Sequence, residues 1–549
     1  MLAHPPRRHP RFALERNHDW RNLFGRLFCG FSPRKAARSG PGSGYSYRGF
    51  ALAGRGSIAL LALAATLLAV TPPRPVTARD RALARRLSHL LADRRFQQGF
   101  WGVYVYSLDR RRVLFQANGD RWFTPASNAK LFTLAAALHL LGCNFRFHTG
   151  LEATAPPGAN GVVAGDLVLR GGGDPSLSGR PYPYRVDPPA PQLPFDPEAV
   201  PSKLARRVAA HGVHRIAGDV VGDDSAFAPD PYPRGWAIGD MLWDYGAPVS
   251  ALTLNDNTRF LQITPGAAVG AAVETRFAPA LLAPQLENHA TTGPAGSATR
   301  LRLRPDPLTG ALRLTGQLAL DSRGDLEALA VPQPALFAAQ LLRQALIEQG
   351  IAVDGVARAR HLAAAAAPSY PLGGWDSPPL AEVLQATAKL SQNLEAEIML
   401  RQLGKWRGAA PTSAAGEAVV RTFLKDAGLN ANDDALVDGS GLARQDLVTP
   451  AGIVRLLGYM ARQPEAAAWR ALFPVAGRDG TLQHRFLGSP AAGRLRAKTG
   501  SLSHVNSLSG YVTTASGEHL AFALLSNNND LPATAVRAQL DRLAAALAQ

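Results

Sequence analysis

Residues 124–142 constrain the fold most strongly, because they predict a helix that is apolar on almost every side. Thr124-Pro125 supplies an N-cap and a first helical residue, and Gly142 supplies a stop. A helix of this composition is usually central and buried. The polar residues of its first turn, among them Ser127 and Lys130, are therefore conspicuous.

Segments near both ends of the chain predict strands that can pair into one sheet. A helix over Asp80–Asp93 precedes two strands joined by a charged turn, Trp101–Ser107 and Val113–Gln116. The C-terminal part predicts three more strands and a last helix: Leu495–Thr499, Leu508–Thr513, His519–Leu525 and Ala533–Ala548. Together, the five strands can form one antiparallel sheet.

The sequence changes to short strands and turns from about residue 150 to residue 368. The prolines between Pro181 and Pro201 predict a loop, and Ala363–Ala367 predicts a linker that returns to the first domain. The other elements predicted from residue 300 onward are a strand-like stretch and three helices: Leu301–Leu320, Pro334–Gly350, Leu380–Leu390 and Leu394–Leu403.

Much of the positive charge of the chain lies in its first residues. The 549 residues carry a net charge of +17, which first suggests an acidic partner such as nucleic acid. Residues 1–57 hold eleven basic residues against two acidic ones and so contribute +9. Removal of residues 1–78 leaves a net charge of +7. No nucleic-acid partner is therefore expected.

Residues 58–78 predict an export signal. The apolar run Ile58–Val70 is followed by small residues that place a cleavage point after Ala78. Thirteen helical residues span ~20 Å, less than the ~30 Å of a hydrocarbon core, which favours cleavage over a membrane anchor. An uncleaved anchor and a start codon placed too far upstream are the alternatives. After cleavage Cys143 stands alone, so no intrachain disulfide is expected.

Ser127-Asn128-Ala129-Lys130 is the first candidate site, since the i, i+3 spacing puts a hydroxyl and an amine on one helix face. A serine needs a nearby base to become a nucleophile, and a lysine can serve if burial or a second cation keeps it neutral. The helix N-terminus adds N–H groups that favour an oxyanion. Chance predicts about 0.3 matches to this spacing, and Ser32–Lys35 is a second match. Taken alone, the pair is equally consistent with a structural helix start.

Two further motifs carry polar groups. Ser391-Gln392-Asn393 lies between two predicted helices, where a helix cap is the ordinary explanation. Lys498-Thr499-Gly500-Ser501 ends a predicted strand, where a cation, hydroxyls and an open glycine backbone can bind a carboxylate beside an added peptide strand. Arginine outnumbers lysine 52 to 7, yet two of the seven lysines fall in the first and third motifs. Arginine cannot act as a catalytic base.

The three motifs, in this order, resemble the active-site serine penicillin-binding proteins and β-lactamases. Ser127 and Ser391 are 264 residues apart, much further than in a simple β-lactamase. This spacing is similar to the D-alanyl-D-alanine carboxypeptidase/endopeptidase family, the low-molecular-mass class C penicillin-binding proteins with inserted domains. Further matching stretches are Gly171–Pro175, Gly218–Phe227, Tyr245–Leu252 and Asp438–Leu442.

The resemblance implies an α+β fold: a transpeptidase-like domain with a five-stranded antiparallel sheet flanked by helices, and two nested, mainly β insertions. The catalytic domain would comprise residues 79–149 and 369–549, with the insertions at 150–368 and the leader at 1–78. The implied activity is exported, penicillin-sensitive hydrolysis of peptidoglycan stem peptides in the periplasm or cell-wall space. A peripheral association with the membrane or cell wall is compatible with it.

The resemblance also implies a role for each motif residue. Ser127 attacks the peptide carbonyl and forms the acyl-ester, with Lys130 as proton acceptor. Ser391 relays the proton to the leaving D-alanine. Asn393 orients Lys130 and the substrate amide, and Lys498 holds Ser391. The backbone N–H groups of the nucleophile and of the serine in the third motif form the oxyanion hole.

Substrate contacts follow from the same resemblance. Thr499 and Ser501, on either side of Gly500, receive the terminal carboxylate of the peptide. Asp223 and Arg444 occupy places where the family lines a pocket for the free amino and carboxyl groups of the stem-peptide diamino acid. Turn capping and a surface ion pair explain these two residues equally well.

Two other functions compete with a peptidase. A β-lactamase needs a group that activates water for rapid deacylation, and the sequence does not identify one. A non-catalytic cell-wall-binding protein on the same scaffold does not need the intact serine and lysine motifs. The chain has no His-Glu-x-x-His motif and no Gly-x-x-x-x-Gly-Lys motif, so neither a metal nor another cofactor is expected.

Overall fold

The antiparallel sheet predicted from the two ends of the chain is present in the computed structural model, which describes residues 76–186, 193–306, 308–363, 369–430 and 432–549. Its strands are β1 (Phe100–Ser107), β2 (Arg112–Ala117), β19 (Leu495–Leu502), β20 (Val505–Thr513) and β21 (His519–Asn527). The order is β19-β20-β21-β1-β2, and every neighbouring pair is antiparallel. The predicted leader up to residue 75 and residues 364–367 of the predicted linker lie outside the described residues.

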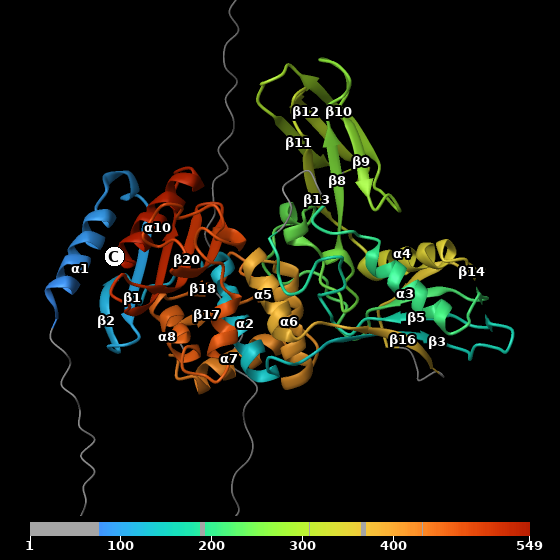
Figure 1. The fold of residues 1–549 in the computed structure, drawn as a ribbon, viewed down its shortest axis with the longest axis horizontal. Coiled ribbons are helices and arrows are strands. Elements are labelled where there is room, and N and C mark those ends of the chain that lie inside the picture. The colour runs from blue at the N-terminus through green and yellow to red at the C-terminus, as the bar shows by residue number, and fades with distance from the viewer. Residues whose placement is uncertain (1–75, 187–192, 307, 364–368, 431) are drawn as a thin grey trace, which may run out of the picture. The chain divides into compact units, whose positions relative to one another are not determined.

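Helices cover both faces of this catalytic sheet (Figure 1). On one face, α1 (Ala78–Leu91) and α10 (Ala533–Leu547) share a core with β1, β20 and β21. On the other face lie α2 (Lys130–Leu141) and α8 (Pro450–Met460), together with α5 (Leu380–Leu390), α6 (Asn393–Arg407), α7 (Ser413–Asp426) and α9 (Ala466–Leu472). The prediction of a central helix is confirmed, because α2 is buried from Lys130 to Leu138. Gly142, with a φ of +87°, ends it.

The start of this helix differs from the prediction. A 3₁₀ turn, η2 (Ala126–Ala129), precedes α2, and Pro125 occupies the N-cap position without a side-chain hydrogen bond. Thr124 is not the cap, because its hydroxyl donates to the carbonyl of Arg444 instead. Ala126 has a φ of +49°, a left-handed conformation that residues with a Cβ rarely adopt. The chain therefore bends sharply just before the first candidate serine.

A second, mixed sheet is built from the middle of the chain. Its order is β15-β7-β5-β3-β16, and β3 (His148–Ala153) pairs with β16 (Tyr370–Asp376). α3 (Ala199–Ala210), which begins inside the predicted proline-rich loop, and α4 (Pro334–Glu348) pack on this sheet. The remaining strands of this region are β4 (Val162–Val163), β5 (Leu167–Arg170), β6 (Arg215–Ile216), β7 (Val220–Asp223), β14 (Ala352–Val353) and β15 (Ala357–Arg360).

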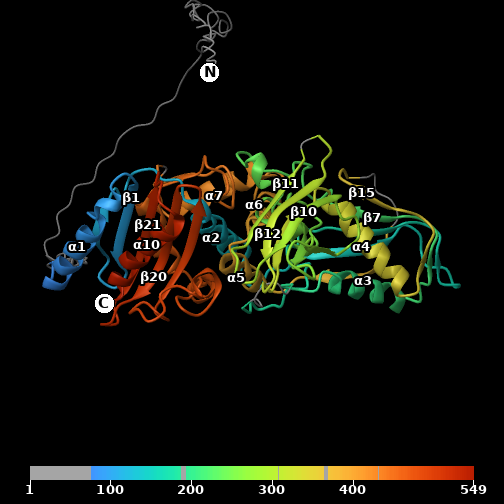
Figure 2. The same ribbon diagram turned by 90° about the horizontal axis from the view of Figure 1, so that it is seen from above.

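A further group of strands lies between β7 and β15 in the sequence. In space β7 and β15 are neighbours and pair with each other (Figure 2). Two three-stranded sheets, β10-β12-β11 and β13-β8-β9, share a small core of their own. The predicted stretch Leu301–Leu320 is two antiparallel strands separated by a turn. The strands are β8 (Thr258–Thr264), β9 (Glu274–Ala278), β10 (Leu286–Gly293), β11 (Arg300–Pro305), β12 (Leu312–Ala319) and β13 (Asp325–Ala330).

The limits of the inserted region follow from strand pairing. β3 begins at residue 148 and β16 ends at residue 376, and both strands belong to the mixed sheet. Division at the predicted residues 150 and 368 would cut one strand and leave the other outside its own sheet. We therefore propose that the inserted region extends from β3 to β16, slightly beyond the predicted limits.

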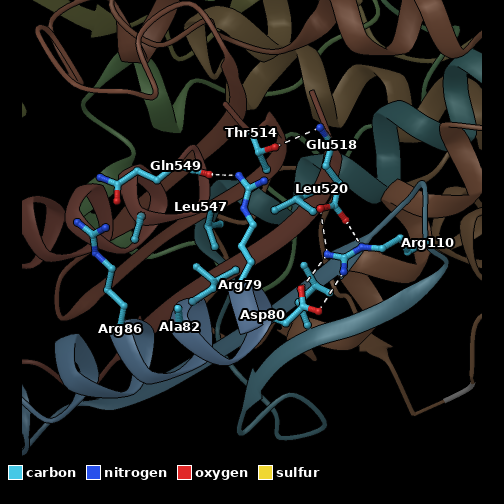
Figure 3. Close-up of a pocket in the computed structure, with 13 residues that line it drawn as sticks. Arg79, Asp80, Ala82, Arg86, Arg110, Thr514, Glu518, Leu520, Leu547 and Gln549 are labelled. Atoms are coloured by element: carbon cyan, nitrogen blue, oxygen red, sulfur yellow. Dashed lines mark hydrogen bonds and ion pairs between the residues drawn. The ribbon is translucent and has the colours of Figure 1, made fainter. Parts of the chain in front are cut away.

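α1 is fixed to the catalytic sheet by charged side chains (Figure 3). The hydroxyl of Thr77 accepts from the backbone N–H of Asp80 at 3.1 Å, and the Asp80 carboxylate accepts from the Thr77 N–H at 2.8 Å. Asp80 also pairs with Arg110 at 2.9 Å, and Arg110 pairs with Glu518 at 2.5 Å. Burial raises the pKa of Asp80, but hydrogen bonds from Arg110 and Thr77 outweigh it and hold the pKa well below its usual range. The predicted cleavage after Ala78 would remove this cap.

Candidate active site

Lys130, the first residue of α2, is fully buried at the centre of the candidate site. Its Nζ donates to Oγ of Ser127 at 3.0 Å, to Oδ1 of Asn393 at 2.6 Å and to the carbonyl of Ser440 at 2.6 Å. Since none of these acceptors carries a charge, burial dominates and lowers the pKa of Lys130 to about 7, against the opposing effect of Asp438. The amine is therefore partly neutral near pH 7.

The three contacts of Lys130 suit the neutral amine. A neutral amine has two N–H bonds, which the oxygens of Asn393 and Ser440 can accept, and one lone pair. That lone pair is then available to the hydroxyl of Ser127, 3.0 Å away. The arrangement can therefore take a proton from the serine without breaking its other two hydrogen bonds.

Ser391 and Asn393 lie where one helix ends and the next begins. Ser391 is the C-cap of α5 with a φ of +65°, so its backbone does serve the capping role that the sequence allowed. Its hydroxyl accepts a hydrogen bond from Nζ of Lys498 at 2.7 Å. Asn393 begins α6, and its Nδ2 donates to the carbonyl of Tyr245 at 2.8 Å. The amide of Asn393 therefore connects Lys130 to the inserted region.

Lys498 is the second buried amine of the site. It lies on β19 with 1% of its surface exposed and donates to Ser391 and, at 2.8 Å, to the carbonyl of Thr499. Burial, followed by the positive charge of Lys130, lowers its pKa well below the ordinary value. Both lysines of the site are thus held by neutral oxygens.

β19 brings the third motif against the backbone of the candidate nucleophile. A Cβ at Gly500 would meet the hydroxyl of Ser507 and would lie 2.8 Å from the carbonyl oxygen of Pro125 and 3.0 Å from the nitrogen of Ser127. The close approach therefore requires glycine at this position. β19 is also the outermost strand of its sheet, a position that suits the addition of an extended peptide.

The polar neighbours of Gly500 are Thr499 and Ser501. The hydroxyl of Thr499 donates to that of Thr481 at 2.8 Å, and the hydroxyl of Ser501 donates to Oδ1 of Asn506 at 3.3 Å. Arg444 lies close by, since its exposed guanidinium donates to the carbonyl of Ser503 at 3.1 Å. These groups form the polar end of the site.

Asp223 has different surroundings. It lies on β7, 1% exposed, with Oδ2 at 3.1 Å from Arg170 and 3.4 Å from Arg360. Its Oδ1 accepts from the backbone N–H and the hydroxyl of Ser225 at 3.0 and 2.6 Å. Both carboxylate oxygens are thus engaged inside the protein. The surroundings fit turn capping and ion pairing, and they do not support recognition of a substrate ammonium.

The turn that follows Asp438 holds Lys130, and the sequence assigned no role to it. The Asp438 carboxylate accepts from the backbone N–H groups of Gly441 at 2.6 Å and Ala443 at 3.0 Å. This turn presents the carbonyl of Ser440 to Lys130. The only sequence signal for it was the Asp438–Leu442 stretch, because the contact joins residues 310 positions apart.

A second supporting contact, between Asn128 and Ser507, had no sequence signal. Nδ2 of Asn128 donates to the Ser507 hydroxyl at 2.6 Å, and that hydroxyl donates to the carbonyl of Pro125 at 2.7 Å. The same amide lies 3.3 Å from the carbonyl of Lys498. These contacts fix the first motif to the third.

Comparison with known proteins identifies the family of the chain. Residues 83–547 match the family model described as the D-Ala-D-Ala carboxypeptidase 3 (S13) family. The chain belongs to this family. It is therefore a serine-type enzyme of the D-alanyl-D-alanine carboxypeptidase kind, as the three motifs predicted.

Two curated relatives span most of the chain. The D-alanyl-D-alanine carboxypeptidase of Actinomadura sp. (strain R39) is 34% identical over 514 residues, which cover 91% of this chain and 90% of the relative. The D-alanyl-D-alanine carboxypeptidase DacB of Haemophilus influenzae is 27% identical over 460 residues, covering 80% and 88%.

Solved structures show the same fold. Penicillin-binding protein 4 (dacB) of Haemophilus influenzae has a TM-score of 0.69 at 25% identity, over 83% of this chain and 97% of that protein. The same protein in complex with a β-lactam gives a TM-score of 0.64, with the same identity and coverage. The predicted fold class is confirmed. Among the helices that the structure describes, none has both the length and the apolar character needed to cross a membrane.

Proposed function

We propose that this S13 enzyme is exported and hydrolyses the D-alanyl-D-alanine terminus of peptidoglycan stem peptides through an acyl-enzyme on Ser127. The observation that carries the proposal is the buried amine of Lys130, 3.0 Å from the Ser127 hydroxyl and held otherwise by neutral oxygens. Such an amine is a base matched to neutral pH. The activity in the names of its relatives supports the same substrate class.

Acylation proceeds by addition and elimination at the peptide carbonyl. Oγ of Ser127 attacks the carbonyl carbon between the last two residues as Lys130 takes the hydroxyl proton. The peptide C–N bond then breaks as Ser391, which accepts a hydrogen bond from Lys498, delivers its proton to the leaving amine and regains one from Lys130. The products are free D-alanine and an ester on Ser127. Asn393 keeps the Lys130 amine in place.

Deacylation reverses the proton path. A water molecule attacks the ester carbonyl and gives a proton to the lysine base, and Ser127 regains a hydrogen as the shortened peptide leaves. The backbone N–H groups of Ser127 and Ser501 stabilise the oxyanion in both steps. Thr499, Ser501 and the exposed Arg444 bind substrate carboxylates at the edge of β19, with Lys498 supplying positive potential.

β-Lactams follow the first step only. The strained amide is attacked by Ser127, and its leaving nitrogen stays tethered to the acyl group, so the enzyme is penicillin-sensitive when hydrolysis of the ester is slow. A cross-linked peptide presents the same D-alanyl carbonyl with a different leaving amine, and we propose that the site also cleaves it as an endopeptidase. A β-lactamase would instead release hydrolysed penicillin quickly.

The deciding experiment incubates the purified enzyme with uncross-linked and cross-linked muropeptides and scores D-alanine release separately from cross-link cleavage. We expect D-alanine release by the wild type and none by Ser127→Ala. A wild type that releases no D-alanine would contradict a carboxypeptidase. If the cross-linked muropeptides stay intact while D-alanine is released, the enzyme is a carboxypeptidase without endopeptidase activity. Rapid hydrolysis of many penicillin molecules per enzyme would favour a β-lactamase.

Export is tested at the N-terminus. We expect the mature protein in the periplasm or cell-wall space, without the apolar run Ile58–Val70. Mass spectrometry of protein from its native host gives the first residue directly. Recovery of the intact leader in the membrane fraction would indicate an uncleaved anchor instead.

A further inference from the structure

Arg180 is a buried cation that joins the inserted region to the catalytic helices. Its side chain is 6% exposed. Nη1 donates to Oε1 of Glu395 on α6 at 2.9 Å, and Nη2 donates to Oδ2 of Asp256 at 2.5 Å. Glu395 lies two residues after Asn393, within the first turn of α6. One guanidinium thus fixes the start of the helix that presents Asn393.

Asp256 lies in a turn of three residues with left-handed backbone conformation. Asn255, Asp256 and Asn257 have φ values of +54°, +56° and +52°, which are rare for residues with a Cβ, and all three are buried. Side chains hold the turn in place: Nδ2 of Asn255 donates to the carbonyl of Pro197 at 2.7 Å, and Nδ2 of Asn257 donates to that of Pro248 at 2.8 Å. Strain of this kind persists where the surroundings over-determine it.

The Asp256 carboxylate also contacts the second motif directly. Its Oδ2 accepts from Nε2 of Gln392 at 3.2 Å. Gln392 is the middle residue of Ser391-Gln392-Asn393, and Ser391 before it is itself left-handed. The motif is therefore held on both sides of Asn393, through Gln392 by Asp256 and through Glu395 by Arg180.

Glu395 is also fixed to the neighbouring helix α5. Its Oε2 accepts a hydrogen bond from the Thr387 hydroxyl at 2.6 Å, and that hydroxyl also lies 2.9 Å from the carbonyl of Val383. Burial raises the pKa of Glu395 to about 7, against the opposing effect of Arg180. The carboxyl group that Arg180 contacts is therefore held from two sides.

We propose that Arg180 and Asp256 are positioning residues for the Ser391-Gln392-Asn393 motif, so that the inserted region sets the geometry of the catalytic centre. The inference rests on the proposed function. Neither residue contacts the reacting atoms. They act through Gln392 and Glu395, which fix where the Ser391 hydroxyl and the Asn393 amide lie. Misplacement of a catalytic group by ~1 Å can cost ~100-fold in rate.

The test compares Arg180→Gln with Arg401→Gln. Arg401 is a matched control because it is also a buried arginine that joins α6 to the inserted region, through the backbone carbonyls of Ala228 and Asp230, but it does not contact the motif. Stopped-flow acylation by penicillin separates the dissociation constant of the initial complex from the acylation rate constant, per active site. Thermal unfolding is recorded for both variants.

We expect Arg180→Gln to lower the acylation rate constant about 10- to 100-fold with the dissociation constant within about threefold. Arg401→Gln should lower the unfolding temperature but keep the rate constant per active site within about threefold of the wild type. Gln392→Met, which removes the contact to Asp256 without touching the buried ion pair, covers the case in which Arg180→Gln does not fold. We expect a smaller loss for it, about three- to tenfold.

Equal acylation rate constants for Arg180→Gln and Arg401→Gln, or wild-type rates for Gln392→Met, would overturn the positioning role. A wild type that neither acylates nor releases D-alanine would instead overturn the proposed function. The two failures are therefore distinguishable.

Discussion

Buried ionisable side chains have neutral partners in the catalytic centre and charged partners in the mixed sheet of the inserted region. Lys130 and Lys498 donate hydrogen bonds to hydroxyl, amide and carbonyl oxygens. Asp223, buried to the same degree, lies between two arginine side chains. Burial without a counter-charge lowers the pKa of a lysine and makes it reactive, whereas burial in an ion pair preserves the charge and serves structure. The surroundings of a buried charge thus distinguish catalytic from structural residues.

The largest effect is expected from Lys130→Arg. Arginine keeps a positive charge in the site but cannot deprotonate, so the proton acceptor is lost. We expect the second-order rate constant for acylation by fluorescent penicillin to fall about 10²- to 10⁴-fold. Lys389→Arg is the comparison, because Lys389 is a buried lysine paired with Asp479 at 2.7 Å. The acylation rate constant of Lys389→Arg should fall by less than about tenfold. Equal falls for Lys130→Arg and Lys389→Arg would contradict the distinction between lysines with and without a paired carboxylate.

The pH dependence of acylation tests the same distinction in the unmodified enzyme. Burial lowers the pKa of Lys130 to about 7, so the neutral amine is abundant above pH 7 and is lost as the pH falls. We expect the acylation rate to approach a drop of about tenfold per pH unit below that value, or about 50-fold between pH 7 and pH 5. Stopped-flow rates across this range measure it. A rate that keeps rising to pH 10 would indicate a lysine with its ordinary pKa.

Asp223→Asn tests the structural side of the comparison. Removal of the charge leaves Arg170 and Arg360 without a common partner, and we expect the free energy of unfolding to fall by about 1–3 kcal/mol. Urea denaturation measures that change. Hydrolysis of peptides with and without a free side-chain ammonium should be affected equally. A loss confined to peptides that carry the ammonium would support the recognition role that the resemblance implies.

The smallest effect is expected at the cap of α1, tested in a chain that begins at residue 76 and therefore keeps Thr77. Thr77→Ala removes the hydroxyl that accepts from the backbone N–H of Asp80, and such caps contribute about 1 kcal/mol. Thr77→Ser keeps the hydroxyl and should retain most of the stability in urea denaturation. Unchanged stability of Thr77→Ala would show that the ion pairs of Asp80, rather than the cap, fix the start of α1.

Local sequence signals were sufficient for most of the catalytic fold. Alternating or continuous apolar runs located all five strands of the catalytic sheet, and the apolar helix at residues 130–141 was placed at the centre of the domain. The start of that helix was misjudged, because Thr124-Pro125 is a good local cap. The left-handed conformation of Ala126, the first residue of the 3₁₀ turn, depends on contacts with distant residues such as Gly441, whose added Cβ would meet the Ala126 carbonyl.

The site could be predicted only in part. The three motifs could be recognised because lysine is rare in this chain, and two of its seven lysines lie in the first and third motifs. The structure brings the three motifs together. Arg180 and Asp256 carried no local signal, because each acts on a residue far away in the sequence. Ser440 was signalled only by the matching stretch Asp438–Leu442. Asp223 was chosen from a matching stretch, and only its neighbours in the mixed sheet show that its oxygens are engaged.

The central claim is that Ser127 carries the acyl group. Tandem mass spectrometry of a proteolytic digest, taken after brief exposure to penicillin, locates the covalent adduct and its stoichiometry. We predict one adduct per chain, on the peptide that contains Ser127, and no adduct in Ser127→Ala. An adduct on another peptide, or undiminished labelling of Ser127→Ala, would contradict the account.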